Sequence, residues 1–197
     1  MRTGTKSVLF GAHCFLLHPW FVAAGWWKLY GFPFDPRLWV AFFVHDLGYM
    51  GKVNMDDEEG ERHVFLGAKI MHWLFDEVCG TCPFRQKIWY QFSFYHSRFM
   101  AKRYNASLSK LAYADKLAIV LTPSWLYLPM ANWSGEIWEY MKLAKASSER
   151  DGKYVSMNIY SDDQRVWFEN VKTYLRAWLK QHQYGSEDTW TPSQRPQ

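Results

Sequence analysis

The sequence of 197 residues predicts an all-α protein. Apolar side chains recur at helical spacing, as at Trp167, Val171, Tyr174 and Trp178, which places them on one buried face. No convincing strand-like alternation of apolar and polar residues interrupts these segments. We therefore expect helices over residues 19–30, 36–44, 61–77, 83–103, 107–121, 135–146 and 161–181.

Glycine and proline residues separate these helices in order. The first two are divided by Gly31, Pro33 and Pro36, and the second and third by the loop 51–60. Later breaks are expected at Gly80, Pro83, Pro123, Pro129 and Arg150-Asp151-Gly152. Without an internal repeat or a long linker, residues 1–182 are expected to form one domain, followed by a flexible polar tail at 183–197.

The composition narrows the classes of partner. The net charge is +4, the isoelectric point is near 8.9, and the basic residues are scattered, so a long nucleic acid is not expected and a small anionic substrate is favoured. Aromatic residues make up 19% of the chain, with 12 tryptophans. At helical spacing, most of them are expected in the core rather than stacked on bases.

Residues 8–24 could be mistaken for a signal peptide or a membrane span. His13, His18 and Pro19 interrupt this apolar stretch, and Lys28 follows closely, whereas a span needs about 20 apolar residues. We interpret the stretch as part of the core and of a site. The expectations are no targeting signal, no membrane partner and a cytoplasmic location.

The most informative feature is His45-Asp46, directly after the apolar run 38–44. Neighbouring residues diverge by about 100° on a helix, so both side chains can reach one ion only where the helix ends. Gly48 and Gly51 permit such an ending. The other candidate ligands lie in separate helical segments: His18, His63, His96 and Asp115. Imidazoles with carboxylates suit a divalent transition metal, namely Mn, Fe, Co, Ni or Zn, as one or two ions.

The residues around these ligands form four recognisable motifs. They are Val44-His45-Asp46-Leu47-Gly48-Tyr49, Glu61-Arg62-His63-Val64-Phe65-Leu66-Gly67-Ala68, Tyr95-His96-Ser97 and Ala114-Asp115-Lys116-Leu117. In the order of these residues and in the motifs around them, the sequence resembles the HD-domain superfamily of metal-dependent phosphohydrolases over roughly residues 13–122. The resemblance implies a helical bundle with the metal site between core helices.

The resemblance also implies roles for the ligands. In that family the first His, the His-Asp pair and the last Asp hold one metal, here His18, His45, Asp46 and Asp115. The two intervening histidines, His63 and His96, either bind a second metal bridged by Asp46 or face the substrate phosphate. His13 is an alternative first ligand, although we favour His18 because Val22-Ala23-Ala24 follows it as in the first helix of the family. His72 and His182 lack matching neighbourhoods and are expected to be structural.

Several other residues are candidates for substrate binding and catalysis. A phosphate needs cationic partners, and the candidates are Lys52, Arg62, Arg98, Lys102 and Lys116. Arg98 is favoured because it follows His96 closely, with a solvated surface cation as the alternative. The candidate catalytic residues are Asp46, His63, His96 and Glu59. Glu59 lies in the acidic run 56–59 and is the candidate general acid or base. Tyr49, Phe99, Trp125 and Tyr127 are aromatic candidates for the pocket wall.

The resemblance implies hydrolysis of a (deoxy)nucleotide phosphate ester or anhydride. The alternative is a mixed-valence di-iron oxygenase of the same superfamily, acting on a small phosphonate or polyol, and a third class is a sensor or binding module. The chain lacks the Gly-Tyr-Pro segment of cyclic-di-GMP phosphodiesterases, and a Glu found in some 5′-deoxynucleotidases is replaced in the region from Gly48 to Gly51. Family relatives often assemble through helical faces, which leaves a homo-oligomer open.

Two cysteines form a Cys-x-x-Cys motif, Cys79 and Cys82. A structural zinc site would need a second pair of ligands, and a redox enzyme would need a βαβ context. We interpret the two thiols as incidental, and Cys14 as a buried small side chain.

Overall fold

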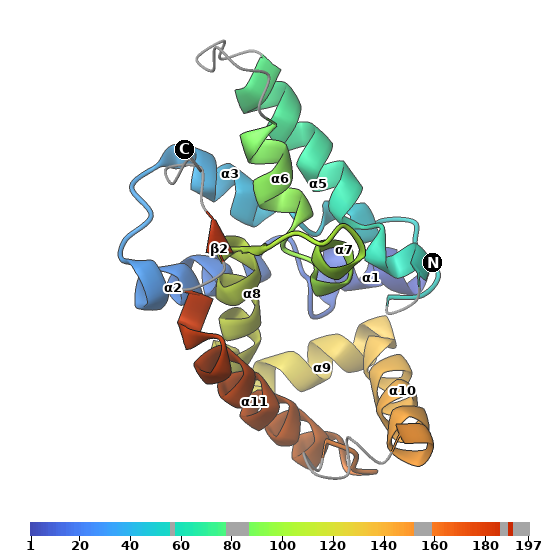
Figure 1. Ribbon diagram of the computed structural model, residues 1–197. Helices are drawn as coiled ribbons and strands as arrows, with labels where there is room; N and C mark the ends of the chain where they lie inside the picture. Colours follow the sequence, from blue (N-terminus) through green and yellow to red (C-terminus); the bar gives the residue numbers. More distant parts are fainter. Residues whose placement is uncertain (56–57, 78–86, 152–158, 186–188, 191–197) are drawn as a thin grey trace.

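A computed structural model describes residues 1–55, 58–77, 87–151, 159–185 and 189–190 (Figure 1). It confirms the all-α prediction. The helices are α1 (Thr3–Phe10), α2 (His18–Tyr30), α3 (Pro36–Val44), α4 (Glu58–Glu61), α5 (Val64–Met71), α6 (Ile88–Phe94), α7 (Arg98–Arg103), α8 (Lys110–Leu121), α9 (Ser124–Ser134), α10 (Glu136–Asp151) and α11 (Gln164–Gln181). Shorter helical segments are the 3₁₀ turns η1 (Leu47–Tyr49) and η4 (Gln183–Gly185) and the π-helical turn η2 (His72–Glu77).

The described residues contain very little extended structure. Two residues of β1 (Leu108–Ser109) pair in parallel with two residues of β2 (Thr189–Trp190). The pairing and η4 both involve the segment 183–197, which was predicted as a flexible tail. None of the helices described is long and apolar enough to cross a membrane.

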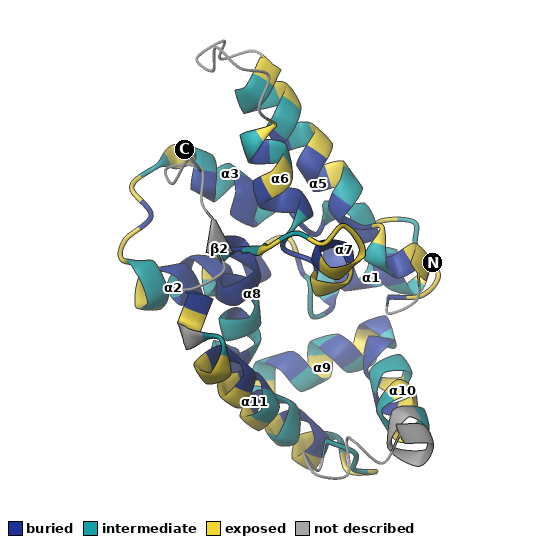
Figure 2. Ribbon diagram, in the orientation of Figure 1, coloured by how far each residue is buried: buried dark blue, intermediate teal, exposed yellow. Residues whose placement is uncertain are grey.

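Helices α2 and α8 lie at the centre of the larger core. They approach so closely that a Cβ on Gly25 would lie 2.6 Å from the carbonyl oxygen of Ala114. Buried side chains of α3, α5 and α6 surround this pair, among them Phe42, Met71 and Phe92, each fully buried. Figure 2 shows the buried faces of these helices turned toward one another. Each helix of this core, namely α2, α3, α5, α6 and α8, carries or adjoins a candidate ligand residue.

A second core lies between α9, α10 and α11, which form the lower part of the view in Figure 1. Tyr127 of α9 stacks on Phe168 of α11 with ring centroids 3.9 Å apart. Ile137 of α10 and Trp167 of α11 are buried beside them. The aromatic spacing noted in the sequence of α11 thus builds a helix-packing interface, as expected.

Local signals account for several helix boundaries. The side chain of Asp35 accepts a hydrogen bond from the backbone N–H of Arg37 at 2.9 Å and caps α3, whose first residue is Pro36. Asp163 caps α11 by accepting from the N–H groups of Arg165 and Val166. Helix α3 has the bounds predicted from the sequence.

Three helices were not predicted. Helix α4 begins within the predicted loop 51–60. Helix α1 occupies part of the N-terminal stretch, and α9 occupies the segment in which Pro123 and Pro129 were interpreted as breaks. Pro123 directly precedes α9 and is compatible with a helix start, while Pro129 lies inside the helix. The helix ends at Gly135, which adopts the left-handed conformation with φ 85°.

One predicted helix is divided. Within the segment predicted as one helix over 83–103, α6 ends at Phe94 and α7 starts at Arg98. Ser97 turns the chain between them and accepts a hydrogen bond from the N–H of Met100. The segment predicted as 61–77 begins its helix at Val64 and passes into η2. Several sequence features lie outside the described residues: Asp56, Asp57, Cys79, Gly80, Cys82, Pro83, Gly152, and residues 186–188 and 191–197.

Candidate metal centre and adjoining cavity

Six candidate ligand side chains converge from five separate places in the chain. Five of them lie at helix boundaries: His18 is the first residue of α2, His45 and Asp46 follow α3, His63 precedes α5, and His96 lies between α6 and α7. Asp115 lies in the interior of α8. The expectation that adjacent His and Asp residues share a site at a helix end is consistent with this arrangement.

The first cluster consists of His18, His45, Asp46 and Asp115, whose ligand atoms lie within 4.8 Å of one another. His18 Nε2 lies 3.1 Å from Asp115 Oδ1 and 3.5 Å from Asp46 Oδ2. His45 Nε2 lies 3.1 Å from Asp46 Oδ2 and 3.8 Å from Asp115 Oδ1. Two imidazoles and two carboxylates thus surround one point.

The second cluster consists of Asp46, His63 and His96. The Nε2 atoms of His63 and His96 are 3.2 Å apart, and each is 3.6 Å from Asp46 Oδ1. Asp46 therefore directs Oδ2 to the first cluster and Oδ1 to the second. A carboxylate shared in this way can bridge two ions.

Backbone carbonyl groups fix the orientation of three of the imidazoles. Nδ1 of His45 donates to the carbonyl oxygen of Phe42 at 2.9 Å, and Nδ1 of His63 donates to that of Gly60 at 2.8 Å. Nδ1 of His96 donates to the carbonyl oxygen of Ser93. Each bond leaves Nε2 as the nitrogen that faces the centre, which is the usual outer-shell arrangement of metal-binding histidines.

Two polar atoms of the centre have no hydrogen-bond partner among the described residues. All six side chains are buried, with exposed fractions between 1% and 8%. His45 Nε2 and Asp46 Oδ2 approach to 3.1 Å without hydrogen-bonding geometry, and neither has another hydrogen-bond partner among the described residues. Buried polar atoms without partners are unfavourable, and coordination of a cation would satisfy them. The buried His and Asp groups are therefore able to hold a metal ion.

Burial and neighbouring charges both shift the pKa values of these groups. Burial lowers the pKa of His63 to about 3, with His96 adding to the effect, so His63 is neutral at pH 7 and able to coordinate. For His45, burial is outweighed by the carboxylates of Asp46 and Asp115, which raise its pKa to about 10. Burial would raise the pKa of Asp115, but the neighbouring Lys116 ammonium group lowers it well below its ordinary range.

Two glycines set the distance between the end of α3 and the start of α5. A Cβ on Gly48 would lie 1.8 Å from the carbonyl oxygen of His63, and a Cβ on Gly67 would lie 2.6 Å from that of Val44 and 2.9 Å from Cα of His45. Only a residue without a side chain permits these contacts. The glycines therefore bring His45 and His63, which belong to different clusters, close together.

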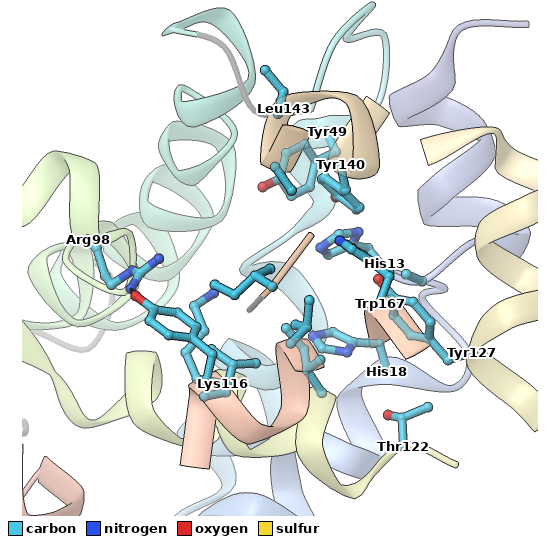
Figure 3. A pocket seen from close by; sticks show the side chains of 17 residues that line it. His13, His18, Tyr49, Arg98, Lys116, Thr122, Tyr127, Tyr140, Leu143 and Trp167 are labelled. Atoms are coloured by element: carbon cyan, nitrogen blue, oxygen red, sulfur yellow. Dashed lines mark hydrogen bonds between the residues drawn. The ribbon is translucent and has the colours of Figure 1, made fainter. Parts of the chain in front are cut away.

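A cavity of about 350 Å³ opens beside the first cluster (Figure 3). His13, His18, Tyr49, Arg98 and Lys116 line its polar end. Further parts of the wall are largely apolar and come from the second core, with Tyr127, Tyr140, Ile159 and Trp167 among them. A ligand in this space would have a charged end near the metal cluster and a less polar end between α9, α10 and α11.

The structure brings two of the five predicted phosphate-binding cations to this cavity. Lys116 Nζ lies 2.8 Å from Asp115 Oδ2, and Arg98 donates to the hydroxyl of Tyr174 at 3.2 Å. The others do not line the cavity. Lys52 Nζ lies 3.7 Å from Glu59 Oε1, Arg62 pairs with Glu58, and Lys102 is exposed. Glu59, the candidate acid or base, has a half-exposed side chain away from the cavity lining.

The aromatic and histidine candidates separate in the same way. Tyr49 and Tyr127 line the cavity, whereas Trp125 is 76% and Phe99 39% exposed. Tyr49 stacks on His63 with ring centroids 3.9 Å apart. His18 rather than His13 belongs to the metal cluster, and Cys14 is buried. His72 pairs with Asp76 and Glu77, and His182 donates to the carbonyl oxygen of Trp178.

Glu136 was not identified from the sequence. Its side chain is fully buried next to the cavity and interacts with His13, which lies 123 residues earlier. The carboxylate begins α10 and has no motif around it, so no local signal marks it. Its contact with His13 forms because α10 packs against α1 and the segment that follows α1.

Comparisons with known proteins do not identify a family for this chain. No family model, curated protein or solved structure matches the chain. The fold and the site together define an all-α protein with a buried His/Asp cluster that could hold a metal ion, which is compatible with a metal-dependent enzyme.

Proposed function

We propose that the chain is a metal-dependent phosphohydrolase of the HD-domain superfamily and that it hydrolyses a (deoxy)nucleotide phosphate ester or anhydride. One observation carries most of the proposal: the shared Asp46 carboxylate lies between two imidazole-containing clusters, beside a cavity that contains Arg98 and Lys116. Ligands for a metal and cations for a phosphate thus occur together. The four sequence motifs that resemble the superfamily contribute all of the ligands except His18.

The donor set fits a divalent transition metal such as Mn, Fe, Co, Ni or Zn. His18, His45, Asp46 and Asp115 would hold one ion, and Asp46, His63 and His96 a second. When bound, such an ion supplies Lewis-acid chemistry, because it polarises a phosphoryl oxygen and makes a water molecule acidic enough to act as a nucleophile near neutral pH.

The remaining steps fall to the protein. Lys116 and Arg98 neutralise and orient the phosphate oxygens from the polar end of the cavity. The ion pair between Lys116 and Asp115 limits the movement of the ammonium group, so it need not be ordered when the substrate binds. The apolar walls near Tyr127 and Trp167 exclude water and accept the less polar part of the substrate, in this proposal a sugar and a base.

The oxygenase remains the alternative, and one observation favours it. His63 and His96 approach Asp46 as ligands of a second ion would, and a carboxylate-bridged pair of irons is what that chemistry requires. The substrate would then be a small phosphonate or polyol, held by the same cations.

The metal content and the products test the proposal together. The protein is purified without chelator, its metals are measured by elemental analysis, and deoxy- and ribonucleotides are screened for released phosphate, pyrophosphate or triphosphate with added Mn, Co, Mg or Zn. We expect metal-dependent release, and the leaving group identifies the bond that is cut. Two irons per chain without hydrolysis of any nucleotide would contradict the phosphohydrolase and favour the oxygenase.

A single-ligand variant tests how the two clusters divide the metal. We expect His63→Ala to retain one ion per chain and to lose the second, because the first cluster does not contain His63. Loss of all metal from this variant would contradict the two-cluster arrangement, provided that its circular dichroism spectrum matches that of the wild type.

A further inference from the structure

His13 and Glu136 form a buried pair at the cavity wall that the metal clusters do not use. His13 lies in the segment between α1 and α2, and Glu136 is the first residue of α10. The Nδ1 atom of His13 lies 3.3 Å from Glu136 Oε2 and 2.9 Å from the hydroxyl of Ser7. Because the Ser7 hydroxyl donates to Glu136 Oε2 at 2.6 Å, Nδ1 of His13 is the donor in this network.

Glu136 accepts several hydrogen bonds besides the one from His13. Its Oε1 atom accepts from the N–H of Ala12 at 2.6 Å and from the Ser134 hydroxyl at 2.7 Å. A Cβ on Gly11 would lie 2.5 Å from Oε1, so a glycine allows the carboxylate to approach the chain. The bonds from Ser7, Ala12 and Ser134 would fix α10 in place without His13, and the imidazole is a further partner.

The fixed imidazole lies close to His18 of the first cluster and lines the cavity. Its ring centroid is 5.7 Å from that of the ligand His18 and 4.9 Å from that of Tyr49, and 17% of its side-chain surface is exposed. His13 lines the same cavity as Tyr140 and Trp167 (Figure 3). With Nδ1 engaged by Glu136 and Ser7, Nε2 is the ring atom available to a ligand.

We propose that His13 is a specificity-determining residue that contacts a sugar hydroxyl of the substrate through Nε2, with Glu136 as the positioning residue behind it. This inference rests on the proposed function, since a phosphate at the metal cluster and a base between the apolar walls place the sugar beside His13. A hydroxyl suits either protonation state of the ring, because it can donate to a neutral Nε2 atom or accept from a protonated one. A site built around such a bond rejects substrates that lack the hydroxyl.

Two matched substitutions separate the contact from packing. In His13→Asn the amide can occupy the place of Nδ1 and keep the bond to Glu136, but nothing replaces Nε2. In His13→Gln the amide reaches toward the place of Nε2. His72→Asn is the control, because it makes the same change at a histidine that pairs with Asp76 and lies outside the cavity lining. Metal content and melting temperature are measured for each variant, so that unfolded or metal-depleted protein is recognised.

The probes are the 5′-triphosphates of adenosine, 2′-deoxyadenosine and 2′,3′-dideoxyadenosine, which contain both an ester and anhydride bonds. For the wild type and His72→Asn, we expect loss of a sugar hydroxyl to lower kcat/KM about 10- to 100-fold. For His13→Asn, the same comparison is expected to give a ratio near one, and for His13→Gln an intermediate ratio. A wild type that does not distinguish the three nucleotides, or an unchanged ratio in His13→Asn, would overturn the inference.

Binding keeps this test separate from that of the proposed function. If the metal-loaded wild type releases no phosphate, the dissociation constants of the three nucleotides are measured by calorimetry in the same variants. A dependence of binding on the hydroxyl that disappears in His13→Asn supports the role of His13 even though hydrolysis has failed. Absence of binding by all three nucleotides overturns the inference about His13 as well.

Discussion

The ligand clusters and the apolar cavity walls are built on different principles. Three of the imidazoles are held by short-range features of their own segments, such as the bond from Nδ1 of His45 to the carbonyl oxygen of Phe42, three residues earlier. The walls have no such local origin, because Tyr127, Tyr140 and Trp167 meet only when α9, α10 and α11 pack together. The orientation of these three imidazoles is therefore set locally, whereas the shape of the apolar walls depends on tertiary packing.

The largest expected effect comes from the ligand side of this comparison. We expect Asp46→Ala to remove the bound metal and to lower turnover by at least about 1,000-fold, because both clusters lose their shared carboxylate. Elemental analysis and initial rates measure both effects. His182→Ala is the matched control, since His182 lies outside both clusters. Turnover that persists in Asp46→Ala without metal would refute the site.

A substitution of Gly67 tests whether backbone contact holds the clusters together. In most helices a change from Gly to Ala is stabilising, but here the new methyl group would meet the backbone of Val44 and His45. We expect Gly67→Ala to lower the free energy of unfolding by about 2 kcal/mol, measured by urea denaturation. The exposed Lys69→Ala on the same helix is expected to change it by less than about 0.5 kcal/mol. A stabilised Gly67→Ala variant would contradict the close approach.

Two cations of α7 test the polar end of the cavity. Arg98 lines the cavity and Lys102 does not, although they lie on the same short helix. We expect Arg98→Ala to raise KM about 10- to 100-fold with unchanged metal content, because a charged hydrogen bond to phosphate is lost. Lys102→Ala is expected to match the wild type. Equal effects of the two substitutions would indicate general electrostatic attraction rather than a contact.

The smallest expected effect is a pH dependence of stability caused by the pair at the wall. Although burial opposes both shifts, the bond between the two side chains lowers the pKa of Glu136 below 4.5 and raises that of His13 above 6.5. The contribution of Glu136 is thus present above pH 4.5 and lost at lower pH, while that of His13 is present below pH 6.5 and lost as the pH rises through its raised value.

Wild type and Glu136→Gln are therefore compared by urea denaturation at a series of pH values. We expect the difference in unfolding free energy to be largest between about pH 5 and pH 6.5 and to shrink on both sides. A difference that is constant across this range would show that the pair stabilises the fold without ionisation. Ser134→Ala, which removes a neutral donor to Glu136, is expected to give a flatter profile.

The same division explains what could be predicted from the sequence. The all-α fold, the bounds of α3 and the ligand-bearing segments follow from periodicity, capping residues and local motifs. Helix α9 was missed because proline was treated as a break, although its tertiary contacts stabilise a helix that contains Pro129. The contact between His13 and Glu136 joins residues 123 positions apart. No pattern within either segment encodes a pairing at that separation.

The backbone contacts at Gly48 and Gly67 have a consequence for protein engineering. A spacing maintained by side chains can be retuned by one methyl group at a time, because a close-packed core responds to single changes in volume. A spacing maintained by backbone against backbone offers no such intermediate steps. These contacts thus fix the separation of His45 and His63 as a property of the backbone, which a change of neighbouring side chains would leave in place.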